Sequence, residues 1–255
     1  MLAVKEYDRD RFDRSKRIGW VNMDGIGKAR CLVVGAGALG NEAVKCLVLS
    51  GFRDITIVDT DDIVLSNLNR CVFFRDADVK NGAKAEILAE RASALVPDAG
   101  ISAKVMRIQD FGGWEDVDMI IGCVDNISAR MHMNAHACHH GIPYIDGGTD
   151  GMIGKVQAVL PGGPCLQCAM NSTHYRAAEI RYSCTGSGAS VPYVPKRAAE
   201  ITTASAVAAM QVREAMKIAS GRSDICIKDM AYYDGTSGEV SVLRITKDAA
   251  CGNHA

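Results

Sequence analysis

The sequence has almost no net charge. Its 255 residues include 29 lysines and arginines and 30 aspartates and glutamates, which leaves a formal charge of −1. Proteins that hold nucleic acid or an anionic membrane by electrostatics carry a clear basic excess. We therefore expect neither nucleic acid nor a membrane among the partners of this protein.

Long apolar runs and a secretory signal are also missing. The most apolar stretch, residues 31–52, is interrupted by Asn41, Glu42 and Lys45, so it predicts a strand, a turn and a helix rather than a membrane span. The N-terminus is charged and lacks the apolar segment of a signal peptide. We therefore expect a cytoplasmic protein, whose ten cysteines are core fillers, metal ligands or nucleophiles rather than disulfide partners.

No internal repeat or low-complexity linker divides the chain, and 48% hydrophobic with 23% charged residues is a globular composition. Apolar residues 31–34 predict a strand that runs into a glycine-rich turn, a helix to residue 50 and a second strand at 55–58. Further strands are predicted at 101–106, 117–124, 143–146 and 155–160, helices at 78–95, 126–139 and 198–220, and an antiparallel hairpin at 231–234 and 240–245. This order predicts an α/β fold: a Rossmann-like, mostly parallel sheet with helices on both faces, plus the C-terminal hairpin.

The turn GAGALG contains three glycines in GxGxxG spacing, Gly35, Gly37 and Gly40. Such spacing lets backbone amides and the positive end of the following helix approach a phosphate. Asp59, at the end of the next strand, is placed to accept hydrogen bonds from ribose hydroxyls. These residues alone leave three interpretations open: the dinucleotide site of a nicotinamide dehydrogenase, an ATP site, or a tight turn without a ligand.

Residues further along the chain favour a nucleoside triphosphate. The segment Ser66–Arg70 and Lys84 add an amide and two cations, which a triphosphate needs and a neutral nicotinamide does not. Asp125 follows another buried strand and is a candidate Mg²⁺ ligand, because magnesium prefers carboxylate and phosphate oxygens. The alternative is that Asp125 only caps the helix that starts near Asn126.

Four residues have the composition of a zinc site. Cys165 and Cys168 form a CxxC motif, and Cys251 and His254 form a CxxH motif. Three thiolates and one imidazole complete a tetrahedral zinc set, which would tie the C-terminal tail to the body as a structural site. A redox pair at the CxxC, and a frayed tail without metal, are the alternatives.

Cys184 lies in the polar, glycine-rich segment YSCTGSGASVP, which is unlike the surroundings of a core cysteine. It is a candidate nucleophile. We predict packing roles for the cysteines in apolar runs, namely Cys31, Cys46, Cys71, Cys123, Cys138 and Cys226. His136, His139 and His140 gather at one helix end, where a solvent-edge position explains them better than a metal site.

With these motifs in place, the sequence resembles the ubiquitin-like-protein activating enzymes (E1 enzymes) and the bacterial enzymes that adenylate sulfur-carrier proteins. The resemblance covers nearly the whole chain and rests on segments 11–15, 35–40, 49–70, 78–86, 108–111, 122–130, 145–162 and the cysteine motifs. The segments LSGFR, SNLNR, IQDF and IDGGT are more similar to the catalytic subunit of the NEDD8-activating enzyme than to the bacterial adenylyltransferases.

The resemblance implies one adenylation domain of the ThiF/E1 type over residues 1–255. Within it, residues 1–30 are an N-terminal arm, residues 169–197 are a short catalytic-cysteine or crossover segment, and a ubiquitin-fold domain is absent. The nucleotide site implied by the family comprises the glycine loop, Asp59 on the ribose, Asp61, Asn67, Arg70 and Lys84 on the triphosphate, Asp125 and Asn126 on Mg²⁺ and nucleotide, and Ile108–Gln109 near the adenine.

In the family, the arginine matching Arg14 reaches across a dimer interface to the partner's ATP. This chain has Ser15 where relatives often have Gln, and a solvated charge in a basic arm is the alternative for Arg14. If Arg14 and the ATP-site residues act together, two copies complete each other, so we predict a homodimer.

The resemblance implies that a β-grasp, ubiquitin-like protein ending in Gly-Gly attacks the α-phosphate of ATP with its C-terminal carboxylate. Cys184 would then take the acyl group as a thioester and pass it to an E2 enzyme. The alternative is an adenylyltransferase for a sulfur-carrier protein, in which a sulfur donor replaces the E2 and a thiocarboxylate forms. A non-catalytic half of an E1 heterodimer is a third hypothesis, against which the retained site residues argue.

Overall fold

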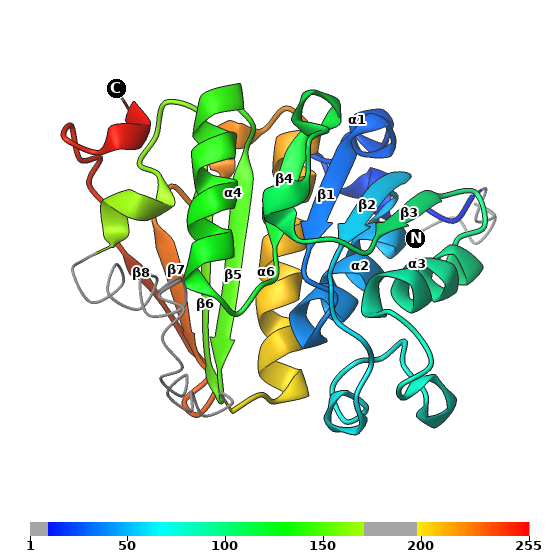
Figure 1. Ribbon diagram of the computed structural model, residues 1–255. Helices are drawn as coiled ribbons and strands as arrows, with labels where there is room; N and C mark the ends of the chain where they lie inside the picture. The colour runs from blue at the N-terminus through cyan, green and yellow to red at the C-terminus, as the bar shows by residue number, and fades with distance from the viewer. Residues whose placement is uncertain (1–9, 171–197, 255) are drawn as a thin grey trace, which may run out of the picture.

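The computed structural model describes residues 10–170 and 198–254, and the structural statements that follow concern these residues. Their core is an eight-stranded sheet in the order β3-β2-β1-β4-β5-β6-β7-β8 (Figure 1). The strands are β1 (Arg30–Val34), β2 (Asp54–Val58), β3 (Gly100–Lys104), β4 (Met119–Gly122), β5 (Tyr144–Asp150), β6 (Ile153–Val159), β7 (Met230–Asp234) and β8 (Glu239–Leu243). The first five pair in parallel and the last three join antiparallel. The predicted mostly parallel sheet with a C-terminal hairpin is thereby confirmed.

Helices cover both faces of this sheet (Figure 1). The α-helices are α1 (Met23–Lys28), α2 (Ala38–Ser50), α3 (Lys84–Leu95), α4 (Ile127–His140) and α6 (Ile201–Ala219). The 3-10 turns are η1 (Ser15–Arg17), η2 (Leu65–Asn67), η3 (Asp76–Asp78), η4 (Ile108–Asp110), η5 (Trp114–Asp116), η6 (Leu166–Ala169), η7 (Ser223–Ile225) and η8 (Gly252–His254). Helices α2, α3 and α6 pack on one face, and α4 packs on the other with η4, η5 and η6. None of the helices in the described ranges is long and apolar enough to cross a membrane.

The central strand β1 shows why the sheet needs both layers. Cys31 and Val33 point into the core beneath α2, α3 and α6, while Leu32 and Val34 point into the core beneath α4. Side chains alternate along a strand, so a strand that is apolar at consecutive positions must be covered on both faces.

Two predicted elements differ from the structure by four residues or more at one end. The helix predicted at 78–95 begins only at Lys84, because η3 ends at Asp78 and Lys80 takes a left-handed conformation with φ 63°. Strand β5 continues past its predicted end at residue 146, through two glycines, to Asp150. A glycine is needed at Gly147, where a Cβ atom would lie 2.3 Å from the side chain of Gln211 on α6.

The strand order places the site. It reverses at the junction of β1 and β4, and in open α/β sheets ligands bind at such a junction, beyond the carboxyl ends of the strands. Residues 35–40 follow β1 and residues 123–126 follow β4 at this edge.

Candidate nucleotide site and metal centre

The glycine-rich loop is folded tightly between β1 and α2. Gly35 has φ +99°, and a Cβ atom on it would lie 2.6 Å from the carbonyl oxygen of Cys123. A Cβ atom on Gly40 would lie 1.9 Å from the carbonyl oxygen of Gly35, so this turn requires glycine at both positions. Gly37 precedes α2 and provides no side-chain cap. The amides of the first helical turn therefore point outward and, with the helix dipole, can bind a phosphate.

Asp59 braces this loop from the end of β2. One carboxylate oxygen accepts the Ala36 N–H at 2.6 Å and the other accepts the Asp61 N–H at 2.7 Å. Burial raises the pKa of Asp59, and the two N–H groups partly offset that effect. Each carboxylate oxygen can accept further hydrogen bonds, so the predicted contact with ribose hydroxyls is chemically compatible with the hydrogen bonds to the loop.

The predicted triphosphate residues come together beside Asp59. The Lys84 ammonium pairs with Asp61 at 2.7 Å, and the Lys84 side chain is only 11% exposed. Burial raises the pKa of the Cys71 thiol to about 11, and Arg70, Lys84 and Asp59 all act on that thiol electrostatically. Arg70, Lys84 and Asp59 therefore all lie near this thiol.

Arg70 and Asn67 shape the neighbouring loop. The Arg70 guanidinium donates to the Ser66 carbonyl and, at 3.1 Å, to the Asn69 side chain. Asn67 is buried, and its side-chain oxygen accepts the Val64 N–H at 3.0 Å, which closes the turn η2. Arg70 therefore sits on an ordered loop with part of its guanidinium at the surface.

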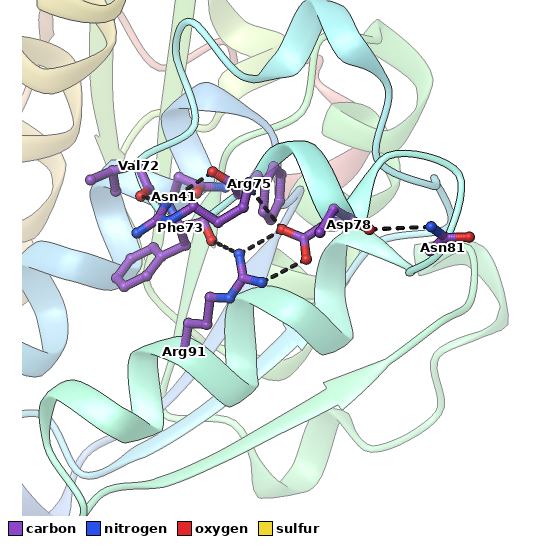
Figure 2. A network of polar contacts seen from close by, with 9 residues as sticks. Asn41, Val72, Phe73, Arg75, Asp78, Asn81 and Arg91 are labelled. Atoms are coloured by element: carbon purple, nitrogen blue, oxygen red, sulfur yellow. Dashed lines mark hydrogen bonds and ion pairs between the residues drawn. The ribbon is translucent and has the colours of Figure 1, made fainter.

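A network that sequence analysis did not detect joins this loop to the glycine loop (Figure 2). The fully buried Asn41 side chain donates to the Ala36 and Gly37 carbonyls and accepts the Phe73 N–H at 3.1 Å. Arg91 on α3 donates to the Phe73 carbonyl and binds both oxygens of Asp78 at 2.6 Å. Phe73 is thus held at both its N–H and its carbonyl, and these hydrogen bonds join the two loops.

We expect Asn41→Leu to destabilise the protein by about 3 kcal/mol, because a leucine of similar size leaves the buried Phe73 N–H and Ala36 carbonyl without partners. The melting temperature should fall by roughly 6–12 °C. The matched control is Asn81→Leu, which removes only an exposed bond to the Ala77 carbonyl. Equal melting temperatures for the two variants would contradict the role of Asn41.

The structure separates the two hypotheses for Asp125. The Asn126 side chain accepts the Ala129 N–H at 2.7 Å and is the N-cap of α4, so the N-cap alternative for Asp125 is wrong. Both residue types are good caps, and the backbone path selects Asn126. The Asp125 side chain is exposed and forms no hydrogen bond or ion pair with the residues described. An exposed carboxylate without a partner at this edge has the chemistry of a Mg²⁺ ligand.

Arg14 lies near the amino ends of the strands, opposite the end of the sheet that carries the nucleotide site. The Phe12 ring packs near Gly51, the C-cap of α2, and beneath the Arg53 guanidinium at 5.4 Å. The 13 residues of α2 separate Gly51 from the glycine loop by roughly 20 Å. The structure therefore does not bring Arg14 to the nucleotide site of its own chain. Cys184 lies within 171–197, outside the described residues, as does most of the predicted segment 169–197.

The four predicted zinc ligands do come together. Cys165, Cys168, Cys251 and His254 form a cluster whose ligand atoms all lie within 4.8 Å of one another. The Cys165 sulfur is 3.7 Å from that of Cys251 and 3.8 Å from that of Cys168, and the Cys168 sulfur is 3.1 Å from His254 Nε2. Two sulfurs bound tetrahedrally at about 2.3 Å from zinc lie about 3.8 Å apart, so the cluster fits such an ion.

Hydrogen bonds prepare Cys165 as a ligand. The pKa of Cys165 is lowered most by a hydrogen bond with the Cys138 thiol on α4. The side chains of Asn134 and Asn253 and the Cys168 N–H lower it further. A thiolate is the form that binds zinc. Cys138 was predicted to serve packing alone. Its contact with Cys165 depends on where α4 lies, which the spacing of the cysteines does not reveal.

The histidines of α4 lie partly against an aromatic side chain. The His136 ring stacks on buried Trp114 with a centroid distance of 4.2 Å and an angle of 7°. His139 and His140 are exposed at the helix end, as predicted. The solvent-edge prediction therefore holds for these two residues, whereas His136 is only half-exposed because its ring stacks on Trp114.

Residues 9–253 match the family model described as the ThiF family, which is nearly the whole chain. The chain belongs to the ThiF family. The resemblance inferred from the motifs is thereby confirmed.

Two curated relatives of this ThiF-family chain are eukaryotic activating enzymes. It is 38% identical over 157 residues to the NEDD8-activating enzyme E1 catalytic subunit of Arabidopsis thaliana, covering 55% of this chain and 34% of the relative. It is 36% identical over 163 residues to a ubiquitin-activating enzyme E1-like protein of Saccharomyces cerevisiae, covering 61% of this chain and 25% of the relative. The chain thus spans less than half the length of the curated relatives it matches.

A bacterial crystal structure shares the fold over a greater length. The crystal structure of E. coli MccB with selenomethionine-labelled MccA superimposes with a TM-score of 0.79 and 18% identity, and covers 97% of this chain and 75% of that one. At this identity the likeness shows the fold alone.

Proposed function

We propose that this ThiF-family protein uses Mg²⁺ and ATP to adenylate the C-terminal carboxylate of a β-grasp, ubiquitin-like protein ending in Gly-Gly. The acyl group then passes to Cys184 as a thioester and on to an E2 enzyme. The observation that carries the proposal is the set of groups at the carboxyl ends of the strands around the junction of β1 and β4: free amides of α2, the Asp59 carboxylate, Lys84 and the unpartnered Asp125. Together they suit a ribose, a polyphosphate and a divalent cation.

In the proposed reaction, the carboxylate oxygen of the substrate attacks the α-phosphate, an acyl-adenylate forms, and pyrophosphate leaves. Both reactants are anionic, so the residues must lower their mutual repulsion. Lys84 and Arg70 supply positive charge, and the glycine-loop amides donate to phosphate oxygens. Asp125 would hold Mg²⁺, which neutralises phosphate charge when bound. Asp59, Asp61, Asn67 and Asn126 orient the nucleotide and the loops around it.

We also propose that the Cys₃His cluster binds structural zinc. The four ligands fill a tetrahedral ion, which leaves no position for a substrate. Two of them come from the segment after β6 and two from the C-terminal tail, so the ion would fasten that tail to α4 and η6. Residues 1–255 would then act as one adenylation domain.

A homodimer is part of this proposal. Arg14 lies about one helix length from the nucleotide site of its own chain, so its role requires the site of a second copy. There its guanidinium would stabilise charge on the transferring phosphoryl group.

The second candidate is adenylation of a sulfur-carrier protein, followed by thiocarboxylate formation. The ThiF-family match over residues 9–253 supports this candidate as much as the first. Both candidates share the adenylate and differ only in its acceptor.

Charging of Cys184 tests the acceptor step. The purified protein is incubated with ATP, Mg²⁺ and a β-grasp protein ending in Gly-Gly, and adducts are resolved on non-reducing gels. We expect Cys184→Ala to keep at least half of the ATP–pyrophosphate exchange rate and to lose the adduct that dithiothreitol cleaves. The matched control is Cys46→Ala, a half-buried cysteine on α2, which should keep both activities. Loss of exchange in Cys184→Ala would contradict the assigned role.

Transfer to an E2 supports conjugation, whereas a thiocarboxylate formed with a sulfur donor supports the second candidate.

A further inference from the structure

We infer that Arg130 is a positioning residue that fixes the loop between β4 and α4, and with it Asp125, against β5. The inference rests on the proposed function of Asp125. Arg130 lies in the first turn of α4, and arginine is a residue type that is mostly exposed in folded proteins. Its side chain is instead only 9% exposed and turns toward the strand ends.

One guanidinium joins three parts of the fold. Its Nη1 pairs with the carboxylate of Asp146 on β5, and its Nη2 donates to the carbonyls of Val124 at 2.6 Å and Gly147 at 2.8 Å. Val124 immediately precedes Asp125. The arginine thus holds the last peptide group before Asp125 to the middle of the neighbouring strand.

The partner of Arg130 is buried deeply. Asp146 is 1% exposed, and its second oxygen accepts the hydroxyl of fully buried Tyr144 at 2.7 Å. Buried ion pairs contribute little net stability, because desolvation of both charges offsets their attraction. An apolar pair at these positions would serve stability as well. Such an apolar pair could not, however, donate a hydrogen bond to the Val124 carbonyl.

Neighbouring hydrogen bonds hold the residues before Val124, and Arg130 holds the Val124 carbonyl. On the opposite face, Gln211 donates to the carbonyls of Gly122 and Ile145 and ties β4 to β5 up to the strand end. The Cys123 N–H then binds the Val34 carbonyl on β1. One residue further on, Arg130 provides the hold on the Val124 carbonyl.

The geometry also requires arginine. A planar fork can reach one carboxylate and two carbonyls at once, whereas the single ammonium of lysine cannot span them. The backbone makes room for the fork at Gly148, where a Cβ atom would lie 3.0 Å from Nη2.

The first test is kinetic. Arg130→Lys keeps the charge opposite Asp146 and loses the fork. We expect ATP–pyrophosphate exchange to lose about 10- to 100-fold in kcat and the half-saturating Mg²⁺ concentration to rise, with KM for the protein substrate unchanged. Asp125→Asn should show the same pattern. The double variant should be no slower than Asp125→Asn alone, because both changes act through one carboxylate.

The matched control is Tyr144→Phe, which removes a hydrogen bond from the same buried network without touching Val124. It should lower the melting temperature and leave kcat within twofold of wild type. If Tyr144→Phe slows exchange as much as Arg130→Lys, or if the effects of Arg130→Lys and Asp125→Asn multiply, the inference is overturned and Arg130 has only a structural role.

The second test needs no activity. Amide hydrogen exchange of the ligand-free protein, read by mass spectrometry over residues 122–129, should be at least fivefold faster in Arg130→Lys than in wild type and Tyr144→Phe. Unchanged exchange would overturn the inference even if the enzyme is active. A wild-type protein without ATP–pyrophosphate exchange would instead refute the proposed function, and the hydrogen-exchange result would still decide whether Arg130 holds the loop.

Discussion

Replacing Lys84 with methionine should lower the rate of ATP–pyrophosphate exchange by about 100- to 1000-fold, the cost of removing one charged donor from a preorganised site. The melting temperature should stay within about 4 °C of wild type, because the partner Asp61 is 65% exposed and such pairs contribute little to stability. Methionine keeps the length of the side chain and the helix propensity at the start of α3. The rate is measured by ATP–pyrophosphate isotope exchange in the presence of the protein substrate, and stability is measured by thermal melting.

Lys28→Met is the matched control for this prediction. Lys28 is the exposed last residue of α1. It lies near the amino end of β1, whereas the nucleotide site lies at the carboxyl end. It should exchange at the wild-type rate. A Lys84→Met protein with more than a tenth of wild-type activity would refute the assignment of Lys84.

The same variant tests the dimer. Arg14→Ala and Lys84→Met should each be inactive, whereas a mixture of the two should recover about a quarter of wild-type activity, because half of the dimers are mixed and each contains one intact site. A mixture as inactive as its components would argue that Arg14 does not act in a second copy.

Loss of zinc is the second large effect that we expect. Cys251→Ser should reduce bound zinc from about one equivalent to a trace and lower the melting temperature by roughly 5–10 °C, because the tail loses its anchor while the sheet stays intact. Metal content by plasma mass spectrometry and thermal melting check both parts. Cys251 is half-buried, so the change disturbs packing less than a change at fully buried Cys165.

Cys46→Ser provides the comparison, since Cys46 is also half-buried but lies on α2, away from the cluster. It should keep its zinc and melt within about 3 °C of wild type. Wild-type protein with less than half an equivalent of zinc would remove the basis of this prediction.

The sequence contained enough local information for the sheet and for part of the site. Apolar runs at consecutive positions indicate strands covered on both faces, and the glycine spacing indicates the turn after β1. The CxxC and CxxH motifs identified the metal cluster because each motif supplies two ligands by itself. Asp59 was found because it stands at the end of a predicted strand, and Lys84 because it is a cation that follows that strand.

Other features depend on contacts between distant segments. Asn41 interrupts an apolar run, and its bond to Phe73, 32 residues away, is not visible in the sequence. Asp125 and Asn126 are adjacent and both suit an N-cap, so the sequence could not assign the cap. Arg130 on a polar helix resembles a surface charge until β5 is placed beside it. Such long-range pairs have no periodicity that a single sequence could reveal.

The distance along the chain between the two halves of the metal cluster has a consequence for the order of folding. Cys168 and Cys251 are separated by about 80 residues, and closing a loop of that length costs about 4 kcal/mol of chain entropy. The two motifs follow β6 and β8, and η8 packs on α4, so these elements must be in place before the four ligands can meet. We therefore expect zinc to enter late, after β6, β7 and α4 have met, so that a kinetic trace of metal uptake during refolding should lag behind the recovery of helical signal.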